Sequence, residues 1–444
     1  MKHNYSSSLR RALSALLLLL VSTLSWAYDF ESGGIYYNIN DDSTTVEVAQ
    51  SPDTKKYTGD MVIPSTVEYK GKTYSVTSIR GWAFSSCTSL TSISLPESLT
   101  SIGEVAFLCC NSLASINIPE GVTSIRGWAF SDCNSLASIN IPEGVTSIGR
   151  SAFSGCSSLT SINIPEGVTS IGRYAFHDCP SLTSITVAPG NSVYDSRQGC
   201  NAIIYTEANT LIIGCSNTVI PEGVTSIGWN AFSGCTSLAT IDIPESVTDI
   251  VDEAFYNCTS LTSIDIPEGV TYIGDYAFRG CSSLTSVDIP KGVMFIKDYA
   301  FWGCSSLTSV DIPEGVASIG KGAFGGCTSL TSIDIPEGVT SIGKGAFESC
   351  TSLTSIDIPE SVTSIGYKAF IGCTSLTNVI CRAEKVPFAS DVFGDTPTAE
   401  ATLYVPASSI EAYKAAAGWK DFKTILPLED YKTGAAHPGR PAGQ

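Results

Sequence analysis

Residues 330–352 read LTSIDIPEGVTSIGKGAFESCTS, and close copies of this 23-residue stretch recur through most of the chain. When the leucine is counted as position 1, positions 1, 4, 6, 10, 13, 18 and 21 are almost always apolar. One copy cannot enclose seven apolar side chains by itself, whereas stacked copies cover one another. The periodicity therefore predicts a repeat solenoid of short coils, rich in β-structure.

The copies follow one another at intervals of 23 residues, with a single interruption. They begin at Leu90, Leu113, Leu136, Leu159, Leu182, Leu238, Leu261, Leu284, Leu307, Leu330, Leu353 and Leu376, and a degenerate copy begins at Val67. Leu182 and Leu238 are 56 residues apart, so 33 extra residues separate two blocks of repeats. Within this insertion, at about residues 188–219, apolar runs at 201–205 and 210–214 flank the turn 206–209 and predict a β-hairpin.

Each copy divides into four short segments. Apolar residues at positions 1, 4 and 6 indicate a strand with one wet side. The Ile-Pro-Glu-Gly-Val segment is typical of a type I turn with Pro at i+1. A second short strand is expected at Val-Thr-Ser-Ile-Gly. The segment from Gly343 to Cys350 and its equivalents are expected to form a helical turn that ends the coil.

The pattern L-x-x-I-x-I-P-x-x-V-x-x-I-x-x-x-A-F-x-x-C resembles the BspA-like leucine-rich repeat of bacterial surface antigens. The resemblance covers about residues 67–380 and implies a leucine-rich-repeat solenoid. Members of this family are typically secreted or surface-exposed and are associated with adhesion to host proteins or other bacteria. The resemblance thus implies a role in adhesion, although a fold alone does not determine function.

The regions outside the repeats predict export and capping. Residues 1–27 combine a basic start, an apolar run and Ser-Trp-Ala, as a secretory signal peptide does. Residues 28–66 alternate as β-hairpins do and predict an N-terminal β cap, and a further hairpin is expected to turn at 70–71. Residues 381–430 predict a C-terminal cap with a strand at 401–405, a helix at 409–417 capped by Ser408 or Ser409, and a last strand at 424–428. Residues 431–444 are expected to be disordered.

The composition excludes several classes of function. The chain has 43 acidic and 25 basic residues and a formal net charge of −18, which disfavours nucleic acid as a partner. No segment after the signal peptide is long and apolar enough to be a transmembrane segment. With three His in total, no zinc-ligand spacing, no Ser-His-Asp set and no phosphate-binding loop, we expect no enzyme, no metal centre and no cofactor. His177-Asp178-Cys179 is interpreted as core, because Cys179 is an ordinary position 21.

An acidic row is the first candidate binding feature. Position 5 should point outward from the concave strand face, because it lies between two inward positions. It is Asn in the first block and Asp in the second, namely Asp242, Asp265, Asp288, Asp311, Asp334 and Asp357, and position 8 is Glu in ten copies. Three interpretations stay open: a face for a basic protein, weak Ca²⁺ sites, and protection of an exposed sheet against aggregation.

The second candidate is a set of variable positions. Positions 15, 16 and 19 change between copies and carry Arg150, Arg173, Trp229 and Trp302, together with Tyr174, Tyr256, Tyr276 and Tyr299. Exposed aromatics and Arg are typical anchors of protein interfaces. The alternative is that these positions lie on a convex loop and vary without constraint.

Most of the 16 cysteines occur once per coil, at the same position of the repeat. Twelve of them occupy position 21, where each interior thiol has two equivalent neighbours, so no unique pairing is specified and thiols are expected. Cys200 and Cys215 face each other across the predicted hairpin of the insertion. They form either a disulfide or two packed thiols.

These features together predict a secreted or cell-surface protein that is not an enzyme and binds an extracellular protein. The ligand class is a host matrix protein or a bacterial surface protein, contacted at several points of the repeat surface. The alternative hypothesis is a structural protein of the cell envelope with no specific ligand.

Overall fold

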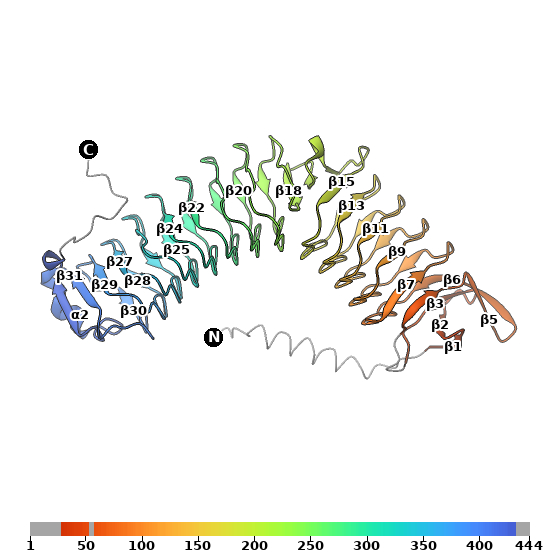
Figure 1. Ribbon diagram of the computed structural model, residues 1–444, viewed down its shortest axis with the longest axis horizontal. Helices are drawn as coiled ribbons and strands as arrows, with labels where there is room; N and C mark the ends of the chain where they lie inside the picture. The colour runs from red at the N-terminus through yellow and green to blue at the C-terminus, as the bar shows by residue number, and fades with distance from the viewer. Residues whose placement is uncertain (1–27, 53–56, 432–444) are drawn as a thin grey trace. The chain divides into compact units, whose positions relative to one another are not determined.

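The computed structural model describes residues 28–52 and 57–431, so the predicted signal peptide and all but the first residue of the predicted disordered tail lie outside the described residues. The chain divides into two compact units (Figure 1). The first contains the residues up to 136 with 142–153 and 170–173. The second contains 137–141, 154–169 and the residues from 174 onward.

The first unit is built on two sheets. One sheet begins with the antiparallel strands β1 (Phe30–Ser32), β2 (Ile35–Ile39) and β3 (Thr45–Val48). The hairpin of β5 (Thr66–Tyr69) and β6 (Lys72–Ile79) turns at 70–71, as the sequence predicts, and β6 pairs in parallel with β3. The sheet continues through β8 (Ser101–Ile102), β10 (Ser124–Ile125), β12 (Ser147–Ile148) and β14 (Ser170–Ile171). The second sheet contains β4 (Gly59–Val62), β7 (Leu90–Ser94) and β9 (Ser115–Asn117).

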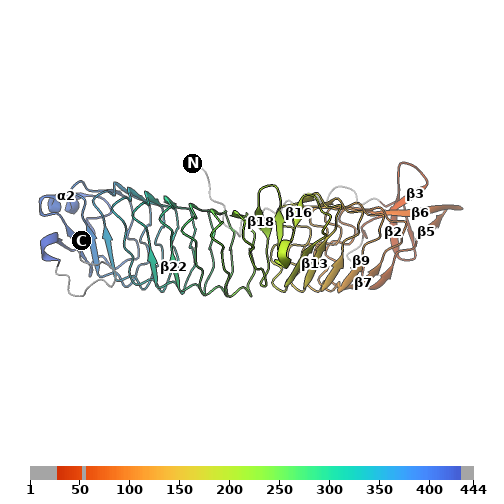
Figure 2. The same cartoon turned by 90° about the horizontal axis from the view of Figure 1, so that it is seen from above.

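The second unit repeats this arrangement coil by coil (Figure 2). Strands at positions 3–6 are β11 (Ser138–Asn140), β13 (Ser161–Ile164), β15 (Ser184–Val187), β22 (Ser286–Asp288), β24 (Ser309–Asp311), β27 (Ser355–Ile358) and β29 (Asn378–Cys381). Strands at positions 12–13 are β19 (Ser226–Ile227), β20 (Asp249–Ile250), β21 (Tyr272–Ile273), β23 (Phe295–Ile296), β25 (Ser318–Ile319), β26 (Ser341–Ile342) and β28 (Ser364–Ile365), and β30 (Phe388–Ala389) continues this sheet. The insertion adds β16 (Tyr194–Asp195), the 3₁₀ turn η1 (Arg197–Gly199) and the hairpin of β17 (Ile203–Tyr205) and β18 (Thr210–Ile213).

Equivalent positions of neighbouring coils pair in register and build continuous core columns. Ser318 and Ile319 pair with Ser341 and Ile342, for example. All seven predicted core positions are buried, with few exceptions. The phenylalanines of position 18 stack with centroid distances of 5.0–5.6 Å, from Phe84 to Phe153 in the first unit and from Phe232 to Phe393 in the second. Position 17 is a core position that the sequence reasoning missed, although its constant Ala was the signal.

The segment expected to be a helical turn has a different backbone. Positions 16 and 20 adopt positive φ in the coils on both sides of the insertion, for example at Tyr299 (57°) and Gly303 (74°). The reason lies in the hydrogen bonds to the next coil, which are donated by alternate residues, such as Tyr299 N to Lys321 O (2.7 Å) and Phe301 N to Ala323 O (2.8 Å). A helical turn would direct these N–H groups within its own coil. The segment is therefore a series of stacked turns.

The predicted proline turn is shifted by one residue. Val122 N donates to Pro119 O at 3.0 Å, so Pro is residue i of the turn and not i+1. The Gly of position 9 is explained by close approach, since a Cβ on Gly121 would lie 2.8 Å from Leu99 O. Where Ser98 replaces this Gly, its hydroxyl donates to Val76 O at 2.7 Å.

The C-terminal cap closes the last core column. β31 (Thr402–Val405) and β32 (Thr424–Pro427) extend the sheet of β27 and β29, followed by η3 (Leu428–Asp430). Helix α2 (Ile410–Ala415), preceded by η2 (Ala407–Ser409), is shorter than predicted. Ser409 precedes the helix but does not cap it with its side chain, because its hydroxyl donates to Glu384 O at 2.7 Å. The buried Trp419 packs against Phe393 and covers the end of the phenylalanine column.

The cysteines of position 21 form a column beside the phenylalanines, here called the Cys ladder. Most of their thiols donate to the carbonyl of the phenylalanine one coil earlier, as Cys304 Sγ does to Phe278 O at 3.2 Å. The ladder members Cys258, Cys281, Cys304, Cys327 and Cys350 are fully buried. Burial raises the pKa of the Cys304 thiol to about 12, because it disfavours the thiolate. These residues act as small apolar groups with one satisfied donor.

Candidate functional site

The six aspartates of position 5 form one row on the second unit, here called the Asp ladder. Five are exposed and Asp357 is partly exposed, as the alternation of the strand predicts. Asp288 pairs in register with Asp311 on neighbouring strands, and isolated bridges join Asp242 to Asp265 and Asp334 to Asp357. Adjacent carboxylates are thus one strand spacing apart, about 5 Å at the backbone. The ladder is a continuous band of negative charge.

Only the last carboxylate of the Asp ladder forms an ion pair within the described residues. Arg382 donates from Nε and Nη2 to the two oxygens of Asp357, at 2.8 and 2.5 Å. This bidentate contact raises the pKa of the Arg382 guanidinium. The pair is solvent-exposed and contributes little stability. The remaining negative charge is available to a partner.

Aromatic side chains gather on the turn side of three consecutive coils, residues 238–306. We call them the aromatic patch: Tyr256, Tyr272, Tyr276, Phe295, Tyr299 and Trp302. Tyr276 and Tyr299 stack at 5.0 Å between centroids, and Trp302 meets Tyr299 edge-on at 5.6 Å. Of the variable positions that the sequence singled out, Tyr256, Tyr276, Tyr299 and Trp302 belong to the patch.

Cationic side chains are packed into the aromatic patch. The Arg279 guanidinium lies 5.5–5.8 Å from the ring centroids of Tyr256, Tyr276 and Tyr299. Lys321 Nζ lies 5.0 Å from the ring of Tyr299. Contacts of this kind are attractive, at about 0.5–1 kcal/mol each at exposed sites. They hold the rings in place before any partner arrives.

The backbone at two patch residues is strained. Tyr276 and Tyr299 have φ of 60° and 57°, where the later coils have Gly322 and Gly345 at 61°. A bulky side chain in the left-handed region costs about 1–2 kcal/mol relative to a more favourable conformation, whereas Gly accepts it readily. Position 16 adopts the same conformation with Trp128, Glu253 and Lys368 in other coils, so this backbone is a property of the repeat and does not mark the patch.

Strand β23 contributes Phe295 to the patch and is preceded by Met294, and sequence reasoning missed both of these apolar residues. Met294 and Phe295 are 57% and 46% exposed, where the coil at 330–352 has Thr340 and Ser341. Lys297 Nζ lies over Phe295 and Tyr272, at 5.7 and 5.4 Å from the centroids. The signal was available in the sequence, because the coil at 284–306 departs from the other copies at several positions at once.

Tyr272 is fixed by an acidic neighbour. Its hydroxyl donates to Asp252 Oδ1 at 3.0 Å, and the same oxygen accepts from Asp275 N at 3.0 Å. Burial, and then the negative charge of Asp252, raise the pKa of Tyr272 to about 12. The ring is thus neutral and oriented.

The structure does not gather the other predicted anchors into this patch. Arg150 lies over the ring of Trp128 at 5.5 Å, within the first unit. Arg173 is exposed in the same unit. Trp229 meets Tyr174 edge-on at 4.4 Å in the second unit, next to the insertion. Of Arg150, Arg173, Trp229 and Trp302, Trp302 alone belongs to the aromatic patch.

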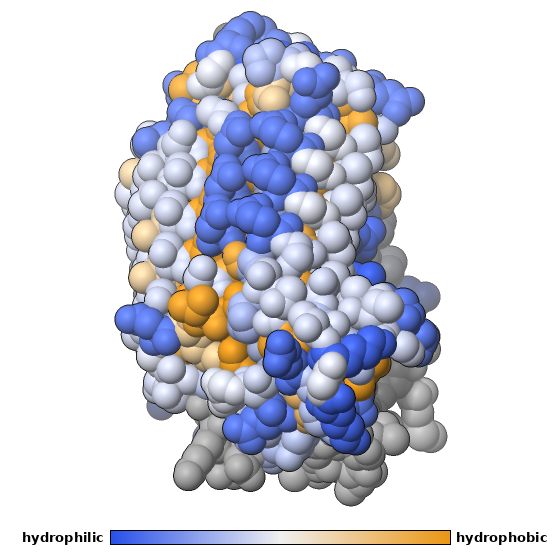
Figure 3. Space-filling model, turned by 90° about the vertical axis from the view of Figure 1, so that its right-hand side faces the viewer, coloured by the Kyte–Doolittle hydropathy of each residue, from blue (hydrophilic) through white to orange (hydrophobic). Residues whose placement is uncertain are grey.

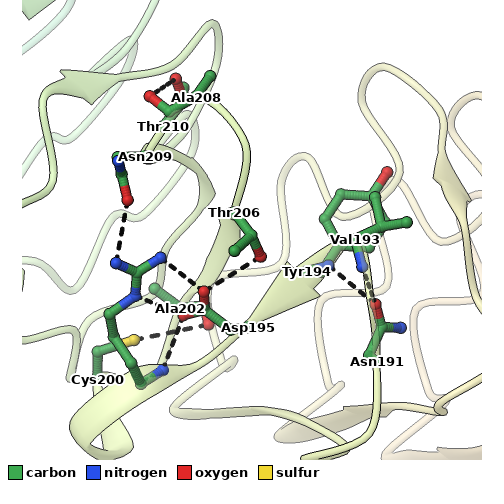
Figure 4. Close-up of polar contacts among 11 residues, drawn as sticks. Asn191, Val193, Tyr194, Asp195, Cys200, Ala202, Thr206, Ala208, Asn209 and Thr210 are labelled. Atoms are coloured by element: carbon green, nitrogen blue, oxygen red, sulfur yellow. Dashed lines mark hydrogen bonds and ion pairs between the residues drawn. The ribbon is translucent and has the colours of Figure 1, made fainter.

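The insertion is held by a polar network (Figure 4). Arg197 donates from Nε and Nη2 to Asp195 at 2.8 and 2.6 Å, and from Nη1 to Asn209 Oδ1 at 3.0 Å. Burial raises the pKa of Asp195, but the hydrogen bonds and charge of Arg197 outweigh it and leave this pKa below its usual value. The network fixes the hairpin turn against η1.

Cys200 and Cys215 are buried thiols in the structure and are not bonded to each other. Cys200 Sγ lies 3.7 Å from Ala202 O, and Cys215 Sγ lies 3.4 Å from Asn201 O. The structure thus represents the second of the two alternatives, two packed thiols. A disulfide between Cys200 and Cys215, in protein isolated from an oxidising compartment, stays a prediction.

No arrangement for catalysis is found at the one sequence that superficially offers it. His177 Nε2 lies 3.1 Å from Asp178 Oδ2, but Cys179 is buried and points its thiol toward a carbonyl. Burial raises the pKa of Cys179 well above its ordinary value, which suppresses the nucleophilic thiolate. In the described part of the chain, no three His, Cys, Asp or Glu side chains are grouped as a metal site would need, and none of the helices could cross a membrane.

The stacked 23-residue coils correspond to a known family. A model of the BspA-type leucine-rich repeat region, with six copies, matches residues 72–197, 204–306 and 294–414. The chain belongs to the BspA-type leucine-rich repeat family. Among curated proteins, no sequence matches it.

Solved structures of bacterial leucine-rich repeat proteins are similar to this BspA-type chain. One from Eubacterium ventriosum has 25% identity and a TM-score of 0.61, over 79% of this chain and 95% of that one. One from Bacteroides ovatus has 33% identity and a TM-score of 0.49, over 80% and 95%. The pneumococcal vaccine antigen PcpA has 16% identity and a TM-score of 0.51, over 91% and 99%, and shows likeness of fold alone.

Proposed function

We propose that this BspA-type protein is exported, acts outside the cell or on its surface, and binds another protein as an adhesin. The ligand class is a host matrix protein or a bacterial surface protein. Export is supported by the signal-peptide pattern of residues 1–27 and by the typical secretion or surface exposure of family members. The contact is centred on the aromatic patch of the second unit.

The observation that carries the proposal is the concentration of Tyr, Trp, Phe, Met and Arg on consecutive coils. These residue types are enriched in the core of protein interfaces, and the most costly interface residues to remove are Trp, Tyr and Arg. The coils that follow, at 307–352, fold with Ser, Thr, Lys and Gly at nearly all of the same positions. The solenoid therefore does not need the patch to fold.

The Asp ladder supplies a second element of recognition. Its row of negative charge favours approach of a partner with basic side chains and accelerates the encounter more than it adds affinity. Because the Debye length is about 8 Å at physiological ionic strength, this contribution weakens in salt. Added salt should therefore slow association, which the ladder accelerates, and should change dissociation from the largely apolar patch much less.

Binding of the purified protein to a panel of matrix and bacterial surface proteins tests the proposal. We expect saturable binding to at least one protein, with a loss of at least tenfold in affinity for the double variant Met294→Thr, Phe295→Ser. These are the residues of the coil at 330–352, so the fold should be unaffected. Phe388→Ser is the matched control, because Phe388 is 75% exposed on β30 and pairs with Ser364 in the equivalent register.

The structural-protein alternative predicts a different result. It expects no saturable partner in the panel, or equal binding by the patch variant and by the Phe388→Ser control. Either result refutes recognition through the patch. A variant with three Asp-ladder residues changed to Asn should slow association with a basic partner while leaving dissociation unchanged.

A further inference from the structure

Opposite charges lie in two separate rows on the same four coils of the second unit, residues 284–375. One row is the part of the Asp ladder that these coils carry, on the sheets of β22, β24 and β27. The other row follows the strands β23, β25, β26 and β28, which belong to a different sheet. We call it the Lys row, and it consists of Lys297, Lys321, Lys344 and Lys368. One chain can therefore present both rows at once.

The turns that carry the Lys row have more positive than negative charge. From position 14 to position 20, the four coils have four lysines and two carboxylates, those of Asp298 and Glu348. Asp298 Oδ1 accepts a hydrogen bond from Lys321 N at 2.7 Å, which ties this carboxylate to the backbone. Among the described residues, none forms a salt bridge with a lysine of the row. The ammonium groups are therefore available to a partner.

The lysines of the row lie over aromatic rings. Lys344 Nζ and Lys368 Nζ are 5.4 and 5.1 Å from the ring centroid of Tyr367, which is 44% exposed. Lys321 Nζ is 5.0 Å from the centroid of Tyr299. Such cation–π contacts hold the ammonium groups close to apolar surface. A partner that meets the Lys row therefore covers ring surface as well as charge.

The Asp ladder has the opposite charge on the same coils. Positions 5 and 8 of these four coils carry seven carboxylates and one lysine. Asp288, Asp311 and Asp334 are exposed, and no salt bridge in the described part of the chain involves them. Three carboxylates in a row thus lack a cation of their own, while the Lys row lacks carboxylates.

The two rows have the same spacing. Both repeat once per coil, because the strands beside them pair in register, as Asp288 does with Asp311 and Ser318 with Ser341. The repeat is one strand spacing, about 4.8 Å. A second copy of the chain laid alongside therefore brings a lysine to an aspartate at each successive coil. A partner with a different repeat would lose this register after one or two contacts.

The ends of the solenoid are less suited to association. At the C-terminal end, Trp419 packs on Phe393 and covers the core. Figure 3 views the molecule from the side of the N-terminal cap, and the surface there is mostly hydrophilic or weakly polar, with scattered apolar areas. The complementary surfaces are therefore those along the coils.

We propose that copies of this chain associate side by side, with the Asp ladder of one copy against the Lys row of the next. Each copy keeps one unused row, so the contact is heterologous and adds further copies unless a ring closes. A single exposed ion pair contributes little, so the association depends on repetition over several coils. The occupant is a second copy, so the inference goes beyond the proposed contact with a foreign protein.

The net charge of −18 does not prevent this association. At physiological ionic strength, exposed charges more than about 8 Å apart are largely screened, whereas the paired groups are in contact. In 1 M salt the Debye length falls to about 3 Å, and the contact itself weakens. The proposal therefore predicts association at physiological salt and its loss in concentrated salt.

Sedimentation velocity of the full chain, over a range of protein concentrations, tests the proposal. We expect oligomers at physiological ionic strength and monomers in 1 M salt. Two triple variants should each be monomeric, namely Lys321→Glu, Lys344→Glu, Lys368→Glu and Asp288→Lys, Asp311→Lys, Asp334→Lys. Positions 15 and 16 already carry Glu104 and Glu253 in other coils, so the first variant should fold.

A mixture of the two triple variants gives the sharpest result. One variant has lysines in both rows and the other has carboxylates in both, so each repels its own copies and fits the other. We expect the equimolar mixture to associate again. The control changes three exposed lysines outside the row to Glu, which alters the net charge by the same amount and should leave association as in the parent: Lys291, Lys385 and Lys420.

Four results would overturn the proposal. They are a parent chain that stays monomeric at physiological ionic strength, association that neither triple variant changes, an equal loss of association in the control, or a mixture that stays monomeric. The unfolding midpoint of each variant separates a lost contact from a lost fold. Because no foreign protein is present in these measurements, a negative result leaves the proposed function untouched.

Discussion

The Cys ladder predicts a steep loss of stability in alkali. Burial raises the pKa of Cys258, Cys281, Cys304, Cys327 and Cys350 above the ordinary value, in most cases well above it. In the unfolded chain the same thiols ionise near pH 8.5. Between these values the folded state retains protons that the unfolded state loses. The free energy of unfolding therefore falls as pH rises, and this contribution is fully present only below about pH 8.5.

The magnitude follows from the number of thiols. Each one contributes a slope of about 1.4 kcal/mol per pH unit while only the unfolded state is ionised. These five thiols together lower the free energy of unfolding by about 7 kcal/mol per pH unit at full slope. Burial also raises the pKa of Cys179, Cys235, Cys373 and Cys381 in the same unit, so the full slope is steeper than this. Because domains are stable by about 5–15 kcal/mol, the second unit should unfold within about two pH units above pH 8.5.

Urea denaturation at several pH values between 7 and 10.5, in reducing buffer, measures this slope. The double variant Cys281→Ala, Cys327→Ala should show a slope smaller by about 3 kcal/mol per pH unit. The variant also loses two thiol–carbonyl hydrogen bonds, which lowers stability at every pH without changing the slope. A free energy of unfolding that does not change up to pH 10, or a pH slope that is identical in the variant, would show that the buried thiols do not cause the loss of stability.

Three further predictions concern packing and covalent structure. Phe301→Ala should lower the free energy of unfolding by about 3–5 kcal/mol, because this buried ring stacks at 5.4 and 5.5 Å on both neighbours; a urea-measured loss below about 1 kcal/mol would contradict it. Gly320→Ala should destabilise more than Gly315→Ala in the same assay, because the new Cβ would meet backbone at 2.6 Å rather than 3.3 Å; equal losses would be inconsistent with the close approach. Peptide mapping of protein from an oxidising compartment should find Cys200 joined to Cys215, and alkylation of both thiols would exclude the bridge.

The comparison of copies within one chain predicted the core accurately. Positions that rarely vary, such as those of Phe347 and Cys350, are buried, and the exposure of Asp334 follows from strand alternation. These features depend on residue type alone. Repetition supplies many independent observations of each position, which an ordinary single sequence lacks.

Features that depend on backbone direction or on neighbouring coils were not predicted. The left-handed conformation at Tyr299 is dictated by hydrogen bonds to the next coil. A tyrosine in the sequence does not indicate such a conformation, whereas a glycine would. Ser409 has the residue type of a helix cap, yet its hydroxyl contacts Glu384 from a distant segment.

Replacement of one whole coil is the sharpest test of protein recognition through the aromatic patch. Residues 284–306 are exchanged for the sequence of 330–352, which removes Met294, Phe295, Tyr299 and Trp302 while retaining every core position. We expect the exchanged protein to fold with equal or greater stability and to lose at least tenfold in affinity for its protein partner, whereas the same exchange at 307–329 should leave the affinity unchanged. Unchanged affinity after exchange of 284–306 would contradict recognition through the aromatic patch.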